Sequence, residues 1–207
     1  MFPEISREDI FRIETRRLWL RCPQAFDVAA AADASAPPPP EAASGDPYRT
    51  AEVLRGWRAG NATGAELHFL LTGRGADRSV LGAVDLEPVR GRAEACGLRL
   101  RVWLDGRAQG QGLATEAVQA MVDAAFMLTA TPLVSTSARV LDPAFRRVVE
   151  KCGFSSCGTG LDPAPDGRGL TASDRFRLDR KAWASLKSWR VPGLPQARVD
   201  GRVRPCL

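Results

Sequence analysis

A mixed α+β fold, with helices packed around one sheet, is the fold class that the sequence predicts from three observations. Short segments alternate polar and apolar residues, as strands do when they bury one face. Longer segments between them have apolar residues at three- and four-residue steps, as amphipathic helices do. The chain has 207 residues, the size of one ordinary domain with short extensions. We therefore expect a single core in which strands and helices alternate around one sheet.

The first part of the chain predicts three strands and two helical segments. One strand pattern ends at Pro23, and two later apolar runs are joined by a glycine-containing turn, as in a hairpin. An alanine-rich segment predicts a short helix that the prolines at 37–40 end, and an exposed loop over residues 34–47 follows. The expected strands cover residues 13–21, 66–72 and 79–86, and the second helical segment covers residues 50–58.

The second part predicts four strands and two longer helices. Apolar residues recur at helical steps from Leu113 to Leu128, after a glycine-rich segment. Asp142 and Pro143 form an N-cap and a first-turn proline for a helix that ends before Gly153. The expected strands cover residues 98–104, 133–140, 154–158 and 173–178, and a loop over residues 161–169 separates the last two.

Composition excludes several classes of protein. Apolar residues make up 44% of the chain and charged residues 26%, as in ordinary globular proteins. No apolar run approaches the roughly 20 residues that span a bilayer, and the first residues do not resemble a signal peptide. We therefore expect a cytoplasmic protein that does not insert into membranes. The five cysteines are scattered and His68 is the only histidine, so we expect neither a disulfide framework nor a metal site, and a hydrogen-bonded strand position for His68.

The net charge of +5 is concentrated at the C-terminal end. Residues 186–207 carry five basic side chains against Asp200 alone, which is +4 of that total. This part also contains three prolines and little apolar periodicity, so we expect a flexible basic tail that could engage an acidic partner such as the ribosome. A nucleic-acid binder would fit the basic charge, but the sequence contains no recognisable nucleic-acid-binding motif.

A glycine-rich segment between a strand and a helix carries the strongest chemical signal. Gly110 and Gly112 lie between the strand that ends at Leu104 and the helix that begins near Leu113. Glycines let backbone amides converge, and a helix N-terminus adds partial positive charge, so this arrangement suits a pyrophosphate. The segment lacks the phosphate-binding lysine motif, and Thr115 stands where the dinucleotide fingerprint has its third glycine. A plain turn is the alternative interpretation.

The same segment resembles the pyrophosphate loop of the GNAT superfamily of acyl-CoA-dependent N-acyltransferases. That loop has glutamine or arginine, then glycine three residues later and glycine or alanine two residues after that. Residues 109–114 match it, as do residues 107–112, and the spacing from Trp103 selects the later register. This spacing is similar to that of the bacterial ribosomal-protein N-terminal acetyltransferases. Further resemblance lies in residues 15–21, 80–82, 150–154 and 177–183.

The resemblance covers residues 13–185 and leaves an N-terminal extension over residues 1–12 and the tail over residues 186–207. It implies a GNAT fold, with a mostly antiparallel sheet splayed between its fourth and fifth strands. It also implies that acetyl-CoA is the cosubstrate and that a primary amine, on a protein N-terminus or a small molecule, attacks it directly in a ternary complex. The implied cofactor-binding residues are Val102, Trp103, Leu104, Gln109, Gly110, Gln111, Gly112, Leu113, Ala114, Thr115 and Asp142.

The residues implied for catalysis depart from the pattern of the family. The positions of its second-helix asparagine, serine and tyrosine hold Asp142, Phe145 and Val149, and Arg99 stands at the position of a strand-four glutamate. The carboxylates left as candidate bases are Asp85, Glu87 and Glu94, each of which a surface charge would also explain. A catalytically weakened module that binds CoA or acyl-CoA is therefore the alternative function. The two loops over residues 34–47 and 161–169 are expected to border the acceptor groove.

Overall fold

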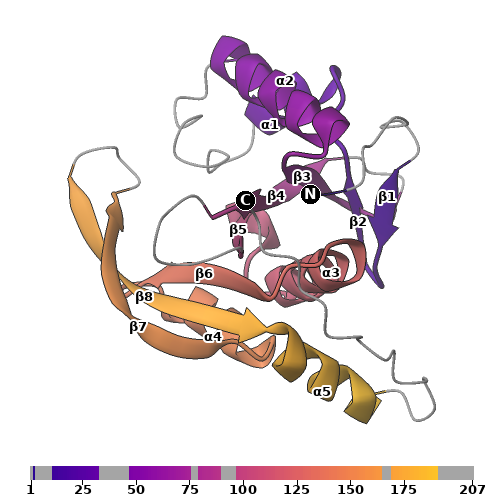
Figure 1. Cartoon of the computed structure of the whole chain (residues 1–207). Helices are drawn as coiled ribbons and strands as arrows, with labels where there is room; N and C mark the ends of the chain where they lie inside the picture. The colour runs from indigo at the N-terminus through magenta and orange to yellow at the C-terminus, as the bar shows by residue number, and fades with distance from the viewer. Residues whose placement is uncertain are drawn as a thin grey trace.

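A computed structural model describes residues 2, 11–32, 47–75, 79–89, 97–164 and 169–190. Its centre is an eight-stranded sheet in the order β1-β2-β3-β4-β5-β6-β8-β7 (Figure 1). Every neighbouring pair is antiparallel except β5 and β6, which are parallel. The strands are β1 (Arg12–Glu14), β2 (Leu18–Arg21), β3 (Leu67–Gly73), β4 (Val80–Pro88), β5 (Leu98–Leu104), β6 (Leu133–Arg139), β7 (Ser155–Pro163) and β8 (Leu170–Asp179). This sheet confirms the predicted α+β fold class.

Helices cover both faces of the sheet (Figure 1). Helix α3 contacts β2, β4 and β5 on one face, where α4 packs beside it, and α1 and α2 contact β3 and β4 on the other. The helices are α1 (Asp27–Ala32), α2 (Pro47–Thr63), α3 (Leu113–Leu128), α4 (Pro143–Lys151) and α5 (Arg180–Arg190). Among the described helices, none is long and apolar enough to cross a membrane.

The core consists of two apolar clusters on opposite faces of the sheet. The larger cluster lies beneath α3 and α4 and includes Phe69, Leu100 and Met121, whose side chains are almost fully buried. The smaller cluster lies beneath α1 and α2 and includes Leu54 and Leu70. Because alternate residues of a strand point to opposite faces, this division assigns each strand side chain to the α3 face or the α2 face.

The single strand predicted over residues 13–21 is wrong, because two strands occupy that segment. β1 and β2 form an antiparallel hairpin. At its turn the Thr15 amide donates to the Leu18 carbonyl, 2.9 Å away, and the Leu18 amide donates to the Thr15 hydroxyl, 3.0 Å away. The side chain of threonine thus closes a turn that the polar-apolar alternation of the segment does not reveal.

The last two strands extend further than predicted, so the loop expected over residues 161–169 is shorter. β7 continues to Pro163 and β8 begins at Leu170, and the two strands pair along their length as a long hairpin. The helix α5 follows β8 directly and was not predicted. This helix runs from Arg180 to Arg190 and so crosses the boundary at residue 185 where the tail was expected to begin. Residues 191–207 of the expected tail lie outside the described part of the chain. At the other end of the chain, Phe2 is buried in the larger cluster.

Candidate functional site

The glycine-rich segment forms an anion-binding geometry at the start of α3. Gly110 and Gly112 have φ values of 73° and 76°, in the region that favours glycine, and Gly112 is the N-cap of α3. The Glu116 amide donates to the Gly112 carbonyl as the first bond of the helix. The amides of residues 110–115 have no hydrogen-bond partner among the described residues. Their partial positive charge and that of the helix N-terminus suit a phosphate or pyrophosphate.

Arg17 and Glu116 connect this loop to the β1–β2 turn. The Nε of Arg17 lies 2.8 Å from Glu116 Oε2, and its Nη1 donates to the Gln111 carbonyl, 2.7 Å away. The Arg17 amide and the Thr15 hydroxyl both donate to Glu116 Oε1, at 2.7 and 2.6 Å. The loop is thereby anchored to the edge of the sheet. The guanidinium also neutralises a carboxylate in the first turn of the helix, close to where an anion would bind.

These contacts set the protonation of Glu116. Burial by itself would raise the pKa of its carboxyl group, but the hydrogen bonds from Thr15 and Arg17 and the charge of Arg17 lower it further than burial raises it. The net effect is a pKa below the ordinary value, so Glu116 is ionised at neutral pH. The ionised form is the one that accepts all of these donors.

The strands β5 and β6 are the fourth and fifth strands expected from the sequence, because the first expected strand is divided into β1 and β2. They separate beside this loop, as the resemblance predicted. They pair only at Leu98 with Val134 and at Arg99 with Ser135, after which neither strand has a partner in the other. On its opposite edge, β5 stays paired with β4 as far as Leu104. The edge of residues 102–104 that faces β6 is therefore open, and it leads directly into the glycine-rich loop.

Most of the residues expected to bind the cofactor gather at this opening. Gln109 donates from its side chain to the Leu104 carbonyl, 3.2 Å away, and Leu113 begins α3. Val102 and Leu104 pack against the larger cluster and Trp103 against the smaller one. The indole nitrogen of Trp103 is buried and has no hydrogen-bond partner in the described part of the chain.

Asp142 lies away from this loop. Its Oδ1 accepts a hydrogen bond from the Phe145 amide, 3.0 Å away, which confirms it as the N-cap of α4. The opposite end of α4 contacts the start of α3, where Cys152 Sγ lies 3.7 Å from the Thr115 carbonyl. Val149 is fully buried and Phe145 packs against the core. These side chains therefore have structural roles in α4.

The candidate bases occupy different surroundings. Asp85 is buried on the α2 face, and its Oδ1 accepts a hydrogen bond from the Nε of Arg101, 3.1 Å away. Glu87 is only partly buried and pairs with the Nη2 of the same arginine. Glu94 lies outside the described residues. Of the two described carboxylates, only Glu87 is open to solvent.

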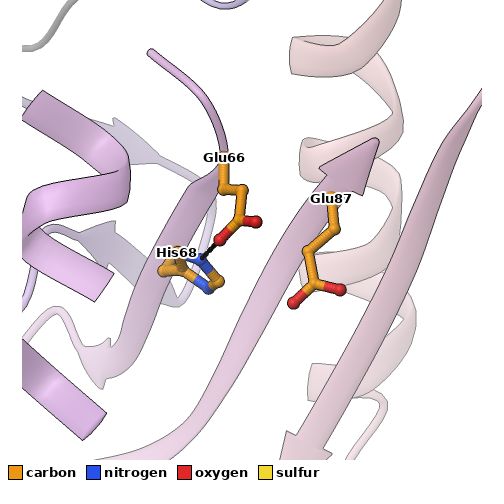
Figure 2. Close-up of side chains that lie close together, drawn as sticks. All are labelled: Glu66, His68 and Glu87. Atoms are coloured by element: carbon orange, nitrogen blue, oxygen red, sulfur yellow. Dashed lines mark hydrogen bonds and ion pairs between the residues drawn. The ribbon is translucent and has the colours of Figure 1, made fainter. Parts of the chain in front are cut away.

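A second carboxylate near Glu87 was not predicted as a site residue. Glu66 precedes β3, and its Oε2 lies 2.9 Å from the Nε2 of His68. Figure 2 shows this contact and the position of Glu87 beside it. His68 is buried, and it occupies a hydrogen-bonded position in β3, as predicted. Its ring stacks on Trp57 with centroids 5.1 Å apart, and its amide and carbonyl both bond to the buried Asn61 side chain. The alternation of β3 places Glu66 and His68 on one face, but only the pairing with β4 brings them to Glu87.

The ligand atoms of Glu66, His68 and Glu87 lie within 4.8 Å of one another. One histidine and two carboxylates form a donor set that a divalent cation can accept. Glu66, Glu87, Pro88 and Arg99 also line a pocket of about 300 Å³. The pocket lies where β5 and β6 begin to separate, because Arg99 belongs to the last paired position of those strands.

A mixed α+β sheet that opens between two strands beside a helix N-terminus is consistent with an acetyltransferase fold. A family model of the acetyltransferase (GNAT) domain matches residues 17–155, and the chain belongs to this family. The resemblance stated from the glycine-rich segment is thereby confirmed. No curated protein has a sequence that matches this chain.

Solved structures share the fold at low sequence identity. The ribosomal-protein-S5-alanine acetyltransferase of Vibrio fischeri has a TM-score of 0.70 and 15% identity, over 84% of this chain and 98% of that one. The ribosomal L7/L12 α-N-protein acetyltransferase RimL, in complex with coenzyme A, has a TM-score of 0.65 and 15% identity, over 83% and 99%. The spermidine/spermine N-acetyltransferase SpeG of Vibrio cholerae has a TM-score of 0.62 and 15% identity, over 82% and 98%.

Proposed function

We propose that this protein is an acetyl-CoA-dependent N-acetyltransferase that transfers an acetyl group to a primary amine in a ternary complex. The observation that carries the proposal is the row of amides over residues 110–115, which lack partners in the described chain and stand beside the opening between β5 and β6. These amides would bind the pyrophosphate of CoA. The open edge of residues 102–104 would pair with the pantetheine arm, and Asp142 would lie further along the opening.

The fit of a pyrophosphate to the loop can be judged from the glycines. No heavy atom of the described residues, apart from the adjacent ones in the chain, lies within 4 Å of the position that a Cβ would take on Gly110. A phosphate can therefore approach the main chain of Gly110 closely. A bound phosphate would satisfy the amides that the helix leaves without partners. Arg17 compensates the charge of Glu116, so the carboxylate in the first turn does not repel the anion.

The reaction requires a neutral amine near the vertex of the opening. The amine nitrogen forms a bond to the acetyl carbonyl carbon, the carbon–sulfur bond breaks, and the CoA thiolate takes up a proton. The proton lost by the amine passes to a base. We assign this role to Glu87, because it lines the pocket at the vertex, whereas Asp85 is buried against Arg101.

The acceptor is a primary amine, either a protein N-terminus or a small molecule. Proteins of similar structure acetylate ribosomal-protein N-termini and polyamines, according to their names, so the fold admits both kinds of acceptor. The test is release of CoA thiol from acetyl-CoA across a panel of amines and peptides. Turnover on at least one acceptor, with a large fall in kcat for Glu87→Gln, would support the proposal. Tight binding of CoA without turnover on any acceptor would contradict it.

A catalytically weakened CoA-binding module is the second candidate, and the α4 side chains favour it. Val149 is buried, and Phe145 packs on the core where relatives are expected to have polar groups. The double variant Asp142→Asn and Phe145→Ser restores two of those groups, and asparagine is as good an N-cap as aspartate. A rise in turnover in this variant would support the weakened module. An unchanged rate would favour the enzyme as it stands.

A further inference from the structure

The pocket at the vertex of the opening presents groups of both charges. Glu66 and Glu87 contribute carboxylates, and Arg99 contributes a guanidinium. Glu87 and Arg99 are direct cross-strand neighbours in β4 and β5, yet Glu87 pairs with Arg101 instead. The Arg99 side chain is exposed and makes no hydrogen bond or ion pair with the described residues. A guanidinium that has no partner among the described residues and lines a small pocket suits a carboxylate or a phosphate.

Glu66 is held in a defined position by its neighbours. Its carboxylate is hydrogen-bonded to the Nε2 of His68. The ring of His68 is stacked on Trp57, and its main chain is hydrogen-bonded to the side chain of Asn61. A carboxylate offers about four acceptor sites, so Glu66 can accept from an ammonium group while it keeps its hydrogen bond with His68. The Glu66 carboxylate is therefore held at the pocket, where it can accept from an ammonium group.

From this distribution of charge we infer that the acceptor is a small zwitterionic amine, an α-amino acid or a compound of that class. Its ammonium group binds between Glu66 and Glu87, and its carboxylate binds Arg99. The inference rests on the proposed function and specifies its substrate class. A volume of about 300 Å³ lies at the lower end for small-molecule pockets and suits a single amino acid.

A divalent cation uses the same carboxylates less well. To bind Glu66, His68 and Glu87 together, it must replace the hydrogen bond between the first two residues and compete with Arg101 for the third. The guanidinium of Arg99 lines the same pocket and would repel it. A zwitterion keeps the existing contacts and supplies a negative group for Arg99.

The inference is tested with pairs of compounds that differ only in the carboxylate. Each pair consists of an amino acid and the amine left after its decarboxylation, for example tyrosine with tyramine, arginine with agmatine and alanine with ethylamine. We expect kcat/KM for the preferred amino acid to exceed that of its amine by at least about tenfold, which is what one charge-assisted hydrogen bond contributes. Arg99→Gln should remove this preference, mainly by raising KM for the amino acid.

The control for Arg99 is Arg147→Gln, which makes the same change of charge on the exposed face of α4. This variant should keep the preference. Glu66→Gln should raise KM for both members of a pair, because it weakens binding of the ammonium group they share. Glu87→Gln should lower kcat as well as raise KM, because it removes the proposed base, so the two carboxylates can be distinguished.

Binding of the same pairs to the protein saturated with CoA gives a readout that does not depend on turnover. Tighter binding of the amino acid in a titration calorimeter, lost in Arg99→Gln, supports the inference even if no acceptor is acetylated and the proposed function fails. Amines that react or bind as well as their amino acids overturn the inference, whether or not the enzyme is active. A preference that survives in Arg99→Gln also overturns it, as does the absence of both binding and turnover for every pair.

Discussion

Arg17 in the β1–β2 turn donates from its Nε to the carboxylate of Glu116 in the first turn of α3, over 2.8 Å. The two residues are 99 positions apart in the chain. Their contact holds the first turn of α3 against the edge of the sheet and, through the Gln111 carbonyl, orients the glycine-rich loop. The geometry of the loop thus depends on a part of the chain outside it.

The Arg17–Glu116 contact predicts a pH-dependent stability. The pKa of Glu116 is lower in the folded than in the unfolded chain, so the contact stabilises the protein above the ordinary value of about 4.3, and this stabilisation is lost as pH falls through the lower folded pKa. Glu116→Gln should lower the free energy of unfolding at pH 7 by about 1–3 kcal/mol. The difference from wild type should shrink toward pH 3 in denaturant titrations. Glu150→Gln, on the exposed side of α4, is the control. An equal difference at both pH values would contradict the prediction.

The glycine-rich loop predicts a specific loss of CoA affinity in Gly112→Ala. An alanine at a φ of 76° costs about 1–2 kcal/mol, and its Cβ would also contact Arg17 Nη2 at 3.5 Å. A loop that relaxes from this strain displaces its amides, so the Kd for CoA should rise by about tenfold in calorimetric titrations. Gly158→Ala is the matched control, with a φ of 131° and no neighbour within 4 Å of its Cβ position. It should lose stability and keep its affinity for CoA.

The close approach of β4 to the end of β5 predicts that replacing Gly82 destabilises the protein. A Cβ on Gly82 would overlap the carbonyl oxygen of Trp103 and lie 3.0 Å from the Leu104 Cα, and both are main-chain atoms of a paired strand. Gly82→Ala should lose about 1–3 kcal/mol or more in chemical denaturation. Gly56→Ala, inside α2 with open space around it, should gain about 0.5–1 kcal/mol. A similar change in both variants would refute this explanation.

The contacts among Glu66, His68 and Glu87 predict that catalysis does not depend on a metal ion. The histidine nitrogen and one glutamate already bond to each other, and Arg101 pairs with the other glutamate. Dialysis against EDTA should therefore leave the rate of CoA release unchanged. A loss of activity that one equivalent of Zn²⁺ or Mn²⁺ restores would show instead that these residues form a metal centre.

Features that depend on neighbours in the chain could be predicted from the sequence. The cap at Asp142 and the helical face of α3 follow from local hydrogen bonding and periodicity. The division of residues 13–21 into two strands was missed because a side-chain hydrogen bond of Thr15 forms the turn. Glu66 was missed because a glutamate before a strand has no distinguishing pattern. Only its hydrogen bond to His68 and its proximity to Glu87 make it a candidate site residue.

By itself, the sequence determined the α+β class, the glycine-rich start of α3 and the resemblance to an acyl-CoA-dependent family. These features depend on residue types at short spacings, where helix and turn geometry leave few alternatives. Only the tertiary structure decided at which residue β5 and β6 separate, that Arg17 reaches Glu116, and that Glu66, His68 and Glu87 meet. Each of these depends on strand register and on contacts between segments far apart in the chain. A shift of one residue in that register would move every side chain of the strand to the opposite face.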